Sequence, residues 1–242
     1  MRIRFRFRTI PFIATVLLVA LGIALGNWQQ RRADYKTGLQ AQLVARAAEA
    51  PVVLGPALTA AQDMEFRRVT VRGEFVSGWP LFLDNRPNAG VAGFYLVMPF
   101  KIAGSDTHVL VARGWLPRDP RQYGRVPAFQ TPAGQVTIEG RAKASLGHIM
   151  QLGTAAPLKP GAIVQNLDVA QFAQASGLRL QPFFVEQVGA RGAGEALVRN
   201  WPAPALDIDK HRGYAFQWYA LAAMAGLFFV ITGFRSGTKQ VD

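Results

Sequence analysis

The sequence predicts a membrane protein of the α+β class, with two transmembrane helices at the termini flanking a β-rich, antiparallel barrel-like or sandwich-like extracytoplasmic domain. Residues 9–30 and 213–234 each run for 22 positions without a charged side chain. At about 1.5 Å per residue, a helix of that length crosses a hydrocarbon layer of about 30 Å. Between these runs, apolar and polar residues alternate as they do in strands. Only 17% of the residues are charged, which is low for a soluble protein.

The basic residues at both ends of the chain set the expected orientation. Cations without an interspersed acid precede the first apolar run and follow the second: Arg2, Arg4, Arg6, Arg8, Arg235 and Lys239. Loops that remain in the cytoplasm carry the excess of Lys and Arg. We therefore expect a multi-pass protein with cytoplasmic tails at 1–8 and 235–242, transmembrane helices at 9–30 and 213–234, and its middle on the opposite side.

The first apolar run has a second interpretation, as a cleavable secretory signal. A basic start, an apolar stretch and the small residues Ala24 and Gly26 fit such a signal. However, the run is longer than the roughly 7–15 apolar residues of a signal. Trp28 also suits the headgroup end of a retained helix. A retained helix is the favoured interpretation.

Helix-forming residues continue beyond the first span as far as Pro51. We expect a helical extension, loosened at Gly38, and a linker over 31–66. The β-rich domain follows at 67–188, and 189–212 is a linker back to the membrane. The strands are expected at 67–76, 79–83, 94–101, 108–116, 135–142, 162–166 and 183–188.

Three local features refine this expectation for the β-rich domain. Gly104 and Ser105 form the turn of a hairpin between two strands that are apolar on both faces. Gly73 marks a bulge or a close approach of two backbones. One amphipathic helix is expected at 168–175, capped by Asp168 and ended by Gly177.

The composition excludes several classes of function. The formal net charge is +12, but without the six terminal cations and Asp242 there remain 21 basic and 14 acidic residues over Arg31–Arg212. These are scattered and accompany no nucleic-acid motif, so anionic membrane lipids or an acidic partner are the expected counterparts. The absence of cysteine excludes disulfides, thiolate metal sites and thiol redox chemistry.

The start of the second apolar run carries the most suggestive chemical group. If the helix begins near Lys210, then His211, Tyr214, Ala215 and Trp218 share one stripe. A neutral imidazole can ligate haem iron, while small and aromatic residues form a flat apolar wall. The alternative is that His211 is only an interfacial residue, because aromatic and cationic side chains are common at membrane surfaces.

Cations near this histidine could hold carboxylates at the water interface. Lys210 and Arg212 are adjacent in the sequence, and Arg113 or Arg199 could be contributed by the central domain.

Nothing in the sequence indicates an enzyme. There are three histidines, and no nucleophile elbow, P-loop, dinucleotide-binding pattern or catalytic-zinc spacing accompanies them. Neither span contains an ionisable residue, which argues against a membrane enzyme and against a transporter. Small residues spaced by four, Gly22 with Gly26 and Ala222 with Gly226, permit the two spans to pack closely.

Three groups of residues, in order along the chain, resemble the surfeit locus protein one family. The first group is Leu25–Arg32 (LGNWQQRR) with Lys36. The second is Asn85-Arg86, Gly93-Phe94-Tyr95, Pro99-Phe100 and Arg113–Pro117 (RGWLP). The third is Asn200-Trp201-Pro202 with His211-x-x-Tyr214-Ala215-x-x-Trp218. Each group is weak alone, but the set covers almost the whole chain and is specific.

The resemblance implies a non-enzymatic membrane chaperone of respiratory-chain biogenesis, an assembly factor of haem-copper cytochrome c oxidase. It implies transient binding of haem a, with His211 as ligand of the haem iron, and delivery to oxidase subunit I. Haem a synthase is a further candidate partner. Tyr214, Ala215 and Trp218 would form the haem wall, and Lys210 and Arg212 would hold the propionates.

The short Arg-rich start of the chain favours a member from a bacterial inner membrane, with the central domain in the periplasm. A competing hypothesis is a membrane-anchored scaffold that stabilises an oxidase subunit without binding cofactor. The two differ in whether the purified protein is coloured.

Overall fold

The computed structural model describes residues 5–122, 124–151, 153, 155–189, 195–202 and 206–237. The chain divides into two compact units, one of Met1–Leu43 with Pro204–Asp242, the other of Val44–Ala203. Arg2, Arg4, Lys239 and two parts of the linker predicted at 189–212, namely 190–194 and 203–205, lie outside the described residues. The first unit holds the terminal helices, and the second holds the β-rich domain.

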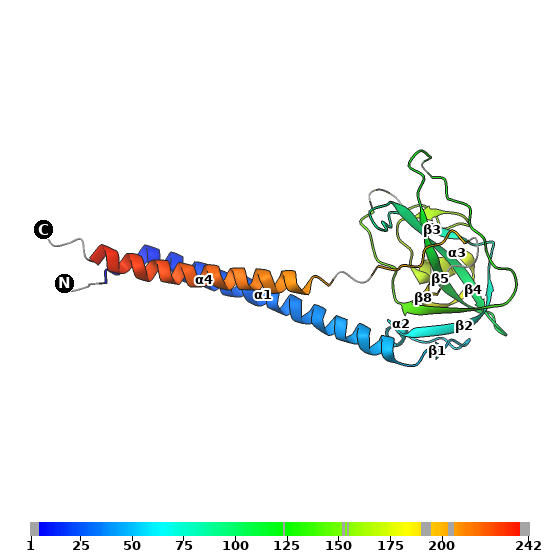
Figure 1. The fold of residues 1–242 in the computed structure, drawn as a ribbon, viewed down its shortest axis with the longest axis horizontal. Coiled ribbons are helices and arrows are strands. Elements are labelled where there is room, and N and C mark those ends of the chain that lie inside the picture. The colour runs from blue at the N-terminus through cyan, green and yellow to red at the C-terminus, as the bar shows by residue number, and fades with distance from the viewer. Residues whose placement is uncertain are drawn as a thin grey trace. The chain divides into compact units, whose positions relative to one another are not determined.

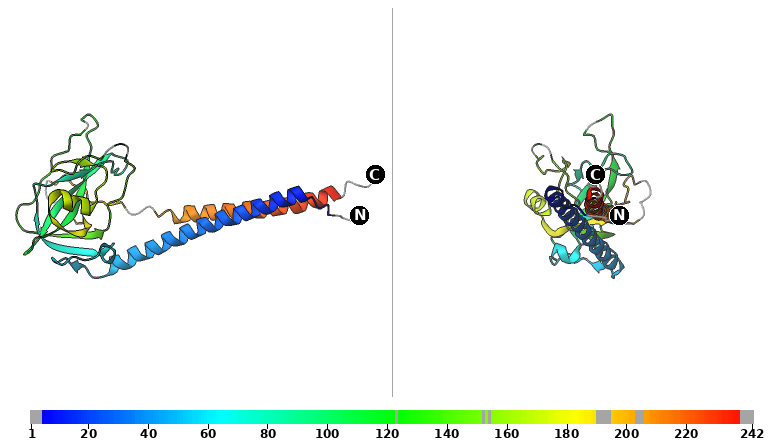
Figure 2. Two further views of the ribbon diagram at one scale, coloured as in Figure 1. Left: turned by 180° about the vertical axis from the view of Figure 1, so that it is seen from behind. Right: turned by 90° about the vertical axis from the view of Figure 1, so that its left-hand side faces the viewer.

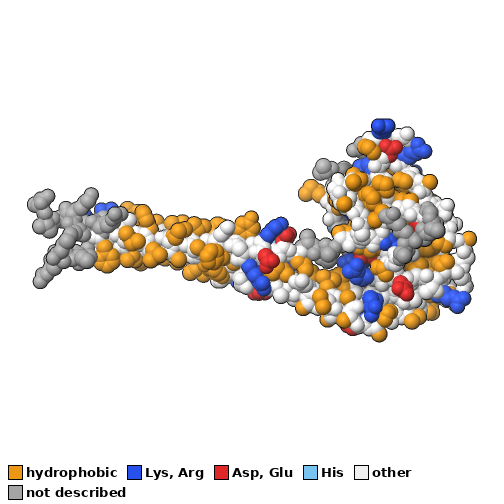
Figure 3. All heavy atoms as spheres, in the orientation of Figure 1, with side chains coloured by type: hydrophobic (Ala, Val, Ile, Leu, Met, Phe, Trp, Pro, Cys, Tyr) orange, Lys and Arg blue, Asp and Glu red, His pale blue; other side chains and the backbone are white. Residues whose placement is uncertain are grey.

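Two long helices, α1 (Thr9–Ala48) and α4 (Ile208–Gly237), lie antiparallel and side by side in the first unit (Figures 1 and 2). Both are long and apolar enough to cross a membrane, and only 11% of the apolar window of each is buried. On the face drawn in Figure 3, hydrophobic side chains are exposed along most of the length of the pair. A soluble protein would bury such helices in its core, so their exposure indicates membrane anchoring.

Helix α1 is longer than a bilayer requires. Its 40 residues correspond to about 60 Å, roughly twice the thickness of a hydrocarbon core. The helix passes through Gly38 without interruption, so the expected loosening there is wrong. A single glycine lowers helix stability only modestly, and the helix-forming residues around Gly38 compensate for that loss.

The second unit is built on a sheet of eight strands in the described residues: β1 (Val52–Val53), β2 (Arg68–Phe75), β3 (Leu81–Leu83), β4 (Gly93–Ile102), β5 (Thr107–Pro117), β6 (Val136–Lys143), β7 (Ile163–Val164) and β8 (Arg179–Gln187). The strand order is β1-β2-β6-β8-β5-β4-β3-β7, and β2 also pairs with β4. The ring β2–β6–β8–β5–β4 therefore closes on itself, so of the two expected arrangements, barrel-like and sandwich-like, the domain has the barrel.

The pairing directions depart from the purely antiparallel expectation. The hairpin of β4 and β5 is antiparallel and turns at Gly104 and Ser105, as predicted. However, β5 pairs with β8 in parallel, and the short strands β1 and β7 add parallel pairs at β2 and β3. The alternation of apolar and polar residues predicts which face of the sheet a side chain occupies. It does not predict whether a partner strand far away in the sequence runs parallel or antiparallel, so the parallel pairs could not be predicted.

Gly73 is where the barrel closes. It pairs with Val136 of β6 and with Ile102 of β4, so β2 changes partner at this residue. A Cβ atom here would lie 1.9 Å from the carbonyl oxygen of Lys101. The expected close approach is confirmed, because only glycine leaves room for the neighbouring backbone.

Two apolar clusters lie on opposite faces of the sheet. Phe94, Leu96 and Met98 of β4 belong to the cluster inside the barrel, whereas Tyr95 and Val97 belong to a second cluster. Burial of both faces explains why the strand reads as continuously apolar.

The second cluster is covered by α3 (Val169–Ser176), where the Asp168 carboxylate accepts from two backbone N–H groups and Gly177 has φ 71°. Both predicted ends of this helix are confirmed. A single turn, α2 (Ala61–Met64), precedes β2.

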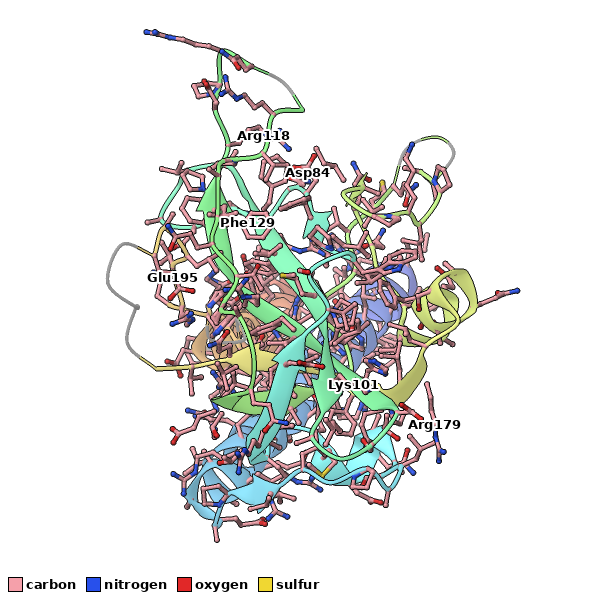
Figure 4. All side chains as sticks on the ribbon, turned by 90° about the vertical axis from the view of Figure 1, so that its right-hand side faces the viewer. Asp84, Lys101, Arg118, Phe129, Arg179 and Glu195 are labelled. Atoms are coloured by element: carbon pink, nitrogen blue, oxygen red, sulfur yellow. The ribbon has the colours of Figure 1, made fainter. Side chains whose placement is uncertain are left out.

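The proline-rich segment after β5 forms a loop and contains no strand in its described residues. Phe129 of this loop packs edge-on against Phe82, with 5.7 Å between ring centroids. At the same end of the barrel, Arg118 forms an ion pair with Asp84 (Figure 4). These contacts hold the loop against the barrel.

Candidate functional site

Small residues line the contact between α1 and α4. The buried positions at this contact include Gly22, Gly26 and Ala33 on α1 and Ala215 and Ala222 on α4. Steps of four and seven residues place each set along one face of its helix. Small side chains at such a face let two membrane helices approach closely.

The two glycines of α1 meet α4 directly. A Cβ atom on Gly22 would lie 2.9 Å from the Cβ of Ala222 and 3.0 Å from the carbonyl oxygen of Trp218. A Cβ on Gly26 would lie 2.4 Å from the Tyr219 ring. By contrast, nothing lies within 4 Å of a Cβ on Gly226, so that glycine does not take part in the contact.

His211 lies on the face of α4 that meets α1. Its imidazole is half-buried, and Nδ1 lies 2.7 Å from the side-chain oxygen of Gln29. An amide oxygen only accepts hydrogen bonds, so in this arrangement Nδ1 carries the proton. The lone pair is then left on Nε2. The contact therefore selects the tautomer whose free nitrogen can act as a ligand.

A second polar pair stabilises the same region. The Tyr219 hydroxyl donates to the side-chain oxygen of Asn27 at 2.8 Å. Sequence reasoning assigned no role to Gln29 or Asn27. A signal was present for Gln29, which falls between Gly26 and Ala33 on a stripe of small residues, where a polar side chain needs a partner.

The four residues expected to share a stripe do not face the same way. Ala215 is 2% exposed and is buried in the helix contact, and Trp218 is half-buried beside it. Tyr214 is 53% exposed and lies on the outer flank. His211 is thus flanked by one ring that is half-buried and one that is open to the surroundings.

Two cations stand beside the histidine at the start of α4. The Lys210 ammonium lies 2.8 Å from a carboxylate oxygen of Asp207, and both side chains are largely exposed. The hydrogen bond and charge of Lys210 lower the pKa of Asp207, which therefore remains ionised. Arg212 is exposed. An exposed ion pair of this kind exchanges readily for another anion.

Arg113 occupies a different environment from the one expected. Its side chain is 1% exposed and donates to the Gln130 carbonyl oxygen at 2.9 Å and to the Thr131 hydroxyl at 3.0 Å. The guanidinium lies 4.6 Å from the centroid of the Phe75 ring and 3.6 Å from the Glu195 carboxylate. Burial lowers the pKa of Arg113 to about 10, which leaves it cationic at neutral pH.

Arg199 shares this network. It donates to the carbonyl oxygen of Arg113 at 3.0 Å and pairs with Glu195 at 2.5 Å (Figure 4 labels Glu195). Both arginines are therefore paired within the barrel unit. The expectation that Arg113 or Arg199 serves as an exposed interface cation is wrong.

Residues from separate parts of the sequence hold the segment before α4 against the barrel. Trp115 exchanges two backbone hydrogen bonds with Val198, at 2.7 and 2.9 Å, and its indole N–H donates to the carbonyl oxygen of Arg86 at 2.7 Å. The side chains of Asn88 and Asn200 bond each other twice. These groups stabilise the fold, and none of them is a free ligand for a cofactor.

The described residues contain no group of three or more His, Asp or Glu side chains able to hold a metal ion. A lone imidazole such as that of His211 binds iron usefully only when a porphyrin supplies the remaining ligands.

In a comparison with known proteins, the model of the SURF1 family matches residues 16–223. A SURF1-like protein of Drosophila melanogaster is 28% identical over 229 residues, covering 86% of this chain and 72% of the fly protein. The cytochrome oxidase assembly protein SHY1 of Saccharomyces cerevisiae is 33% identical over 94 residues, which cover 38% of this chain and 24% of the yeast protein.

Surfeit locus protein 1 of Homo sapiens is 29% identical over 149 residues, covering 52% of this chain and 50% of the human protein. Half or less of the yeast and human proteins is therefore matched.

Proposed function

The chain belongs to the SURF1 family, and we propose that it is a non-enzymatic, membrane-anchored assembly factor for cytochrome c oxidase that holds haem a through His211. The assembly role is supported by the family and by the name of the yeast relative. The proposal includes oxidase subunit I and haem a synthase as partners. It also includes a bacterial inner-membrane location, with both termini cytoplasmic and the barrel in the periplasm.

The observation that carries the haem proposal is the contact between His211 and Gln29. Histidines that ligate metals usually donate their second N–H to a carboxylate or carbonyl oxygen, which fixes the ring and its tautomer. The 2.7 Å separation of Nδ1 from the Gln29 oxygen has this form. Haem a, when bound, would supply the iron, and His211 would hold it.

The neighbouring residues have separate tasks in this proposal. Trp218 and the exposed ring of Tyr214 offer apolar surface on the flank of α4 next to the imidazole. Ala215 keeps α4 close to α1, and so acts on the haem through helix packing rather than as part of a wall. Lys210 and Arg212 would bind the propionates, with Lys210 leaving Asp207 to do so.

The rival role, a scaffold without cofactor, also has an observation in its favour. Arg86, Trp115 and Asn200, which carry much of the family resemblance, make contacts that stabilise the barrel. A barrel stabilised in this way would present a rigid surface on which an oxidase subunit could dock. This role predicts a colourless protein that still co-purifies with subunit I.

The test is the haem content of full-length protein purified from a host that makes haem a. Wild type is expected to carry haem with an imidazole-ligated spectrum, and His211→Ala to lose it. His148→Ala is the matched control, because His148 is exposed on a loop of the other unit. Equal haem stoichiometry and spectrum in wild type and His211→Ala would refute the ligand assignment. A colourless wild type that retains subunit I would favour the scaffold.

A further inference from the structure

The far end of the helix pair, where the chain enters α1 and α4 ends, contains a small cavity. Its volume is about 230 Å³. The cavity is lined by residues of the N-terminal arm and of the last turns of α4: Arg6, Arg8, Pro11, Phe228, Phe229, Thr232 and Gly233. It is separate from His211 and has no part in the proposed haem site.

The cavity exists because the residues before α1 fold back onto α4. The backbone N–H of Arg6 donates to the carbonyl oxygen of Gly233 at 3.1 Å. The Phe5 ring packs where a side chain at Gly233 would be, since a Cβ there would lie 2.1 Å from the ring. Phe5 also contacts Phe229 and Phe234, with ring centroids 5.9 and 5.2 Å away. The arm is thus fixed by a hydrogen bond and by aromatic packing.

Charge and polarity divide this cavity into two parts. Arg6 and Arg8 contribute two cations, and the first turn of α1 contains no acidic residue to offset the positive end of the helix dipole. Phe228 and Phe229 supply an apolar lining that continues onto the exposed surface of α4. A ligand that fits both parts has an anionic head attached to hydrocarbon.

We propose that this cavity binds the phosphate head of an anionic phospholipid, with the acyl chains lying along the apolar surface of α4. Basic cavities between transmembrane helices on the cytoplasmic side are suited to anionic lipid heads, and the cytoplasmic leaflet is rich in such lipids. Arginine pairs with phosphate through two parallel hydrogen bonds, which a general surface charge does not provide.

The experiment measures lipid bound to the full-length chain in detergent micelles doped with phosphatidylglycerol or with phosphatidylcholine of the same acyl chains. Native mass spectrometry counts the lipids. Wild type is expected to retain phosphatidylglycerol selectively. Arg6→Gln with Arg8→Gln is expected to weaken this binding about 25-fold, since each cation contributes about fivefold near an anionic surface. Arg31→Gln with Arg32→Gln removes two exposed cations at the other end of the span and is expected to change little.

Two further variants separate the shape of the cavity from its charge. Gly233→Val keeps every charge but fills the space of the Phe5 ring, so it is expected to weaken binding severalfold. Arg6→Lys with Arg8→Lys keeps the charge and is expected to retain part of the selectivity for phosphatidylglycerol. This variant also keeps the proposal testable if the glutamine variant fails to fold.

Three results would overturn the proposal. The first is equal retention of phosphatidylglycerol and phosphatidylcholine by wild type. The second is an equal loss of lipid binding in the Arg6/Arg8 and the Arg31/Arg32 double variants. The third is displacement of the lipid by millimolar inorganic phosphate. The last result would identify free phosphate as the ligand.

Discussion

Replacing Gly26 with alanine perturbs the helix contact with a single added carbon. The new Cβ would lie 2.4, 2.7 and 2.8 Å from three carbons of the Tyr219 ring. Carbon atoms pack at about 3.5–4.0 Å, so the ring must retreat by about 1 Å or more. This movement of the Tyr219 ring costs free energy, because the Tyr219 hydroxyl donates a hydrogen bond to Asn27 at 2.8 Å.

The magnitude follows from three opposing effects. Overpacking of a tight contact costs about 1–3 kcal/mol, and loss of the Tyr219 hydrogen bond costs about 0.5–1.5 kcal/mol. Alanine stabilises a helix interior by about 1 kcal/mol relative to glycine. Gly26→Ala is therefore expected to destabilise the protein by about 0.5–3.5 kcal/mol.

Gly38→Ala is the matched control, since it makes the same change in the same helix where a Cβ meets nothing within 4 Å. It is expected to stabilise the protein by up to about 1 kcal/mol. Reversible unfolding in detergent, followed by circular dichroism, measures both. If Gly26→Ala stabilised the protein as Gly38→Ala does, α1 and α4 would not pack through Gly26.

Three other changes test separate parts of the structure. Gln29→Leu removes the hydrogen-bond acceptor of the His211 imidazole. It is expected to lower haem affinity about 10–100-fold, as loss of such partners typically does. The control Gln30→Leu changes an exposed residue and should leave haem affinity unaltered. Burial raises the pKa of Glu186, so the folded state binds its proton more tightly than the unfolded state. The ionised carboxylate therefore destabilises the folded state above the raised pKa, and this cost declines below that pKa until it is gone below the ordinary pKa of the unfolded state. Glu186→Gln is accordingly expected to raise the free energy of unfolding at neutral pH and to have little effect in acid; the same gain at both pH values would contradict this. Gly73→Ala places a Cβ against the carbonyl oxygen of Lys101 and is expected to cost about 3 kcal/mol or more, and an unchanged denaturation midpoint would show that the barrel does not close there.

Much of the fold could be predicted because its signals are local. The two spans are marked by uncharged runs, and the strands Gly93–Ile102 and Thr107–Pro117 by apolar residues on both faces. The ends of α3 are marked by Asp168 and Gly177, whose roles depend only on the adjacent backbone. Such features need no knowledge of distant partners.

The remainder depends on contacts between distant parts of the chain. The parallel pairing of β5 with β8 and the burial of Arg113 beside Glu195 have no local signature. The hydrogen bond of Gln29 could not be predicted from the sequence near it, because its partner, His211, lies at the other end of the chain. Tyr214 was expected on the same stripe as His211, but the direction in which α4 meets α1 turns it outward.

The central claim is that α1 and α4 form one packed hairpin whose contact face carries His211, and disulfide trapping tests it most directly. The chain has no cysteine of its own. A Cβ at Gly22 would lie 2.9 Å from that of Ala222, close to the roughly 3.5–4.5 Å of a disulfide. Gly22→Cys with Ala222→Cys should therefore cross-link within one chain on mild oxidation in native membranes. Leu21→Cys with Leu221→Cys, at outward-facing positions, should not. Equal cross-linking of the two pairs, or none in the first, would contradict the claim.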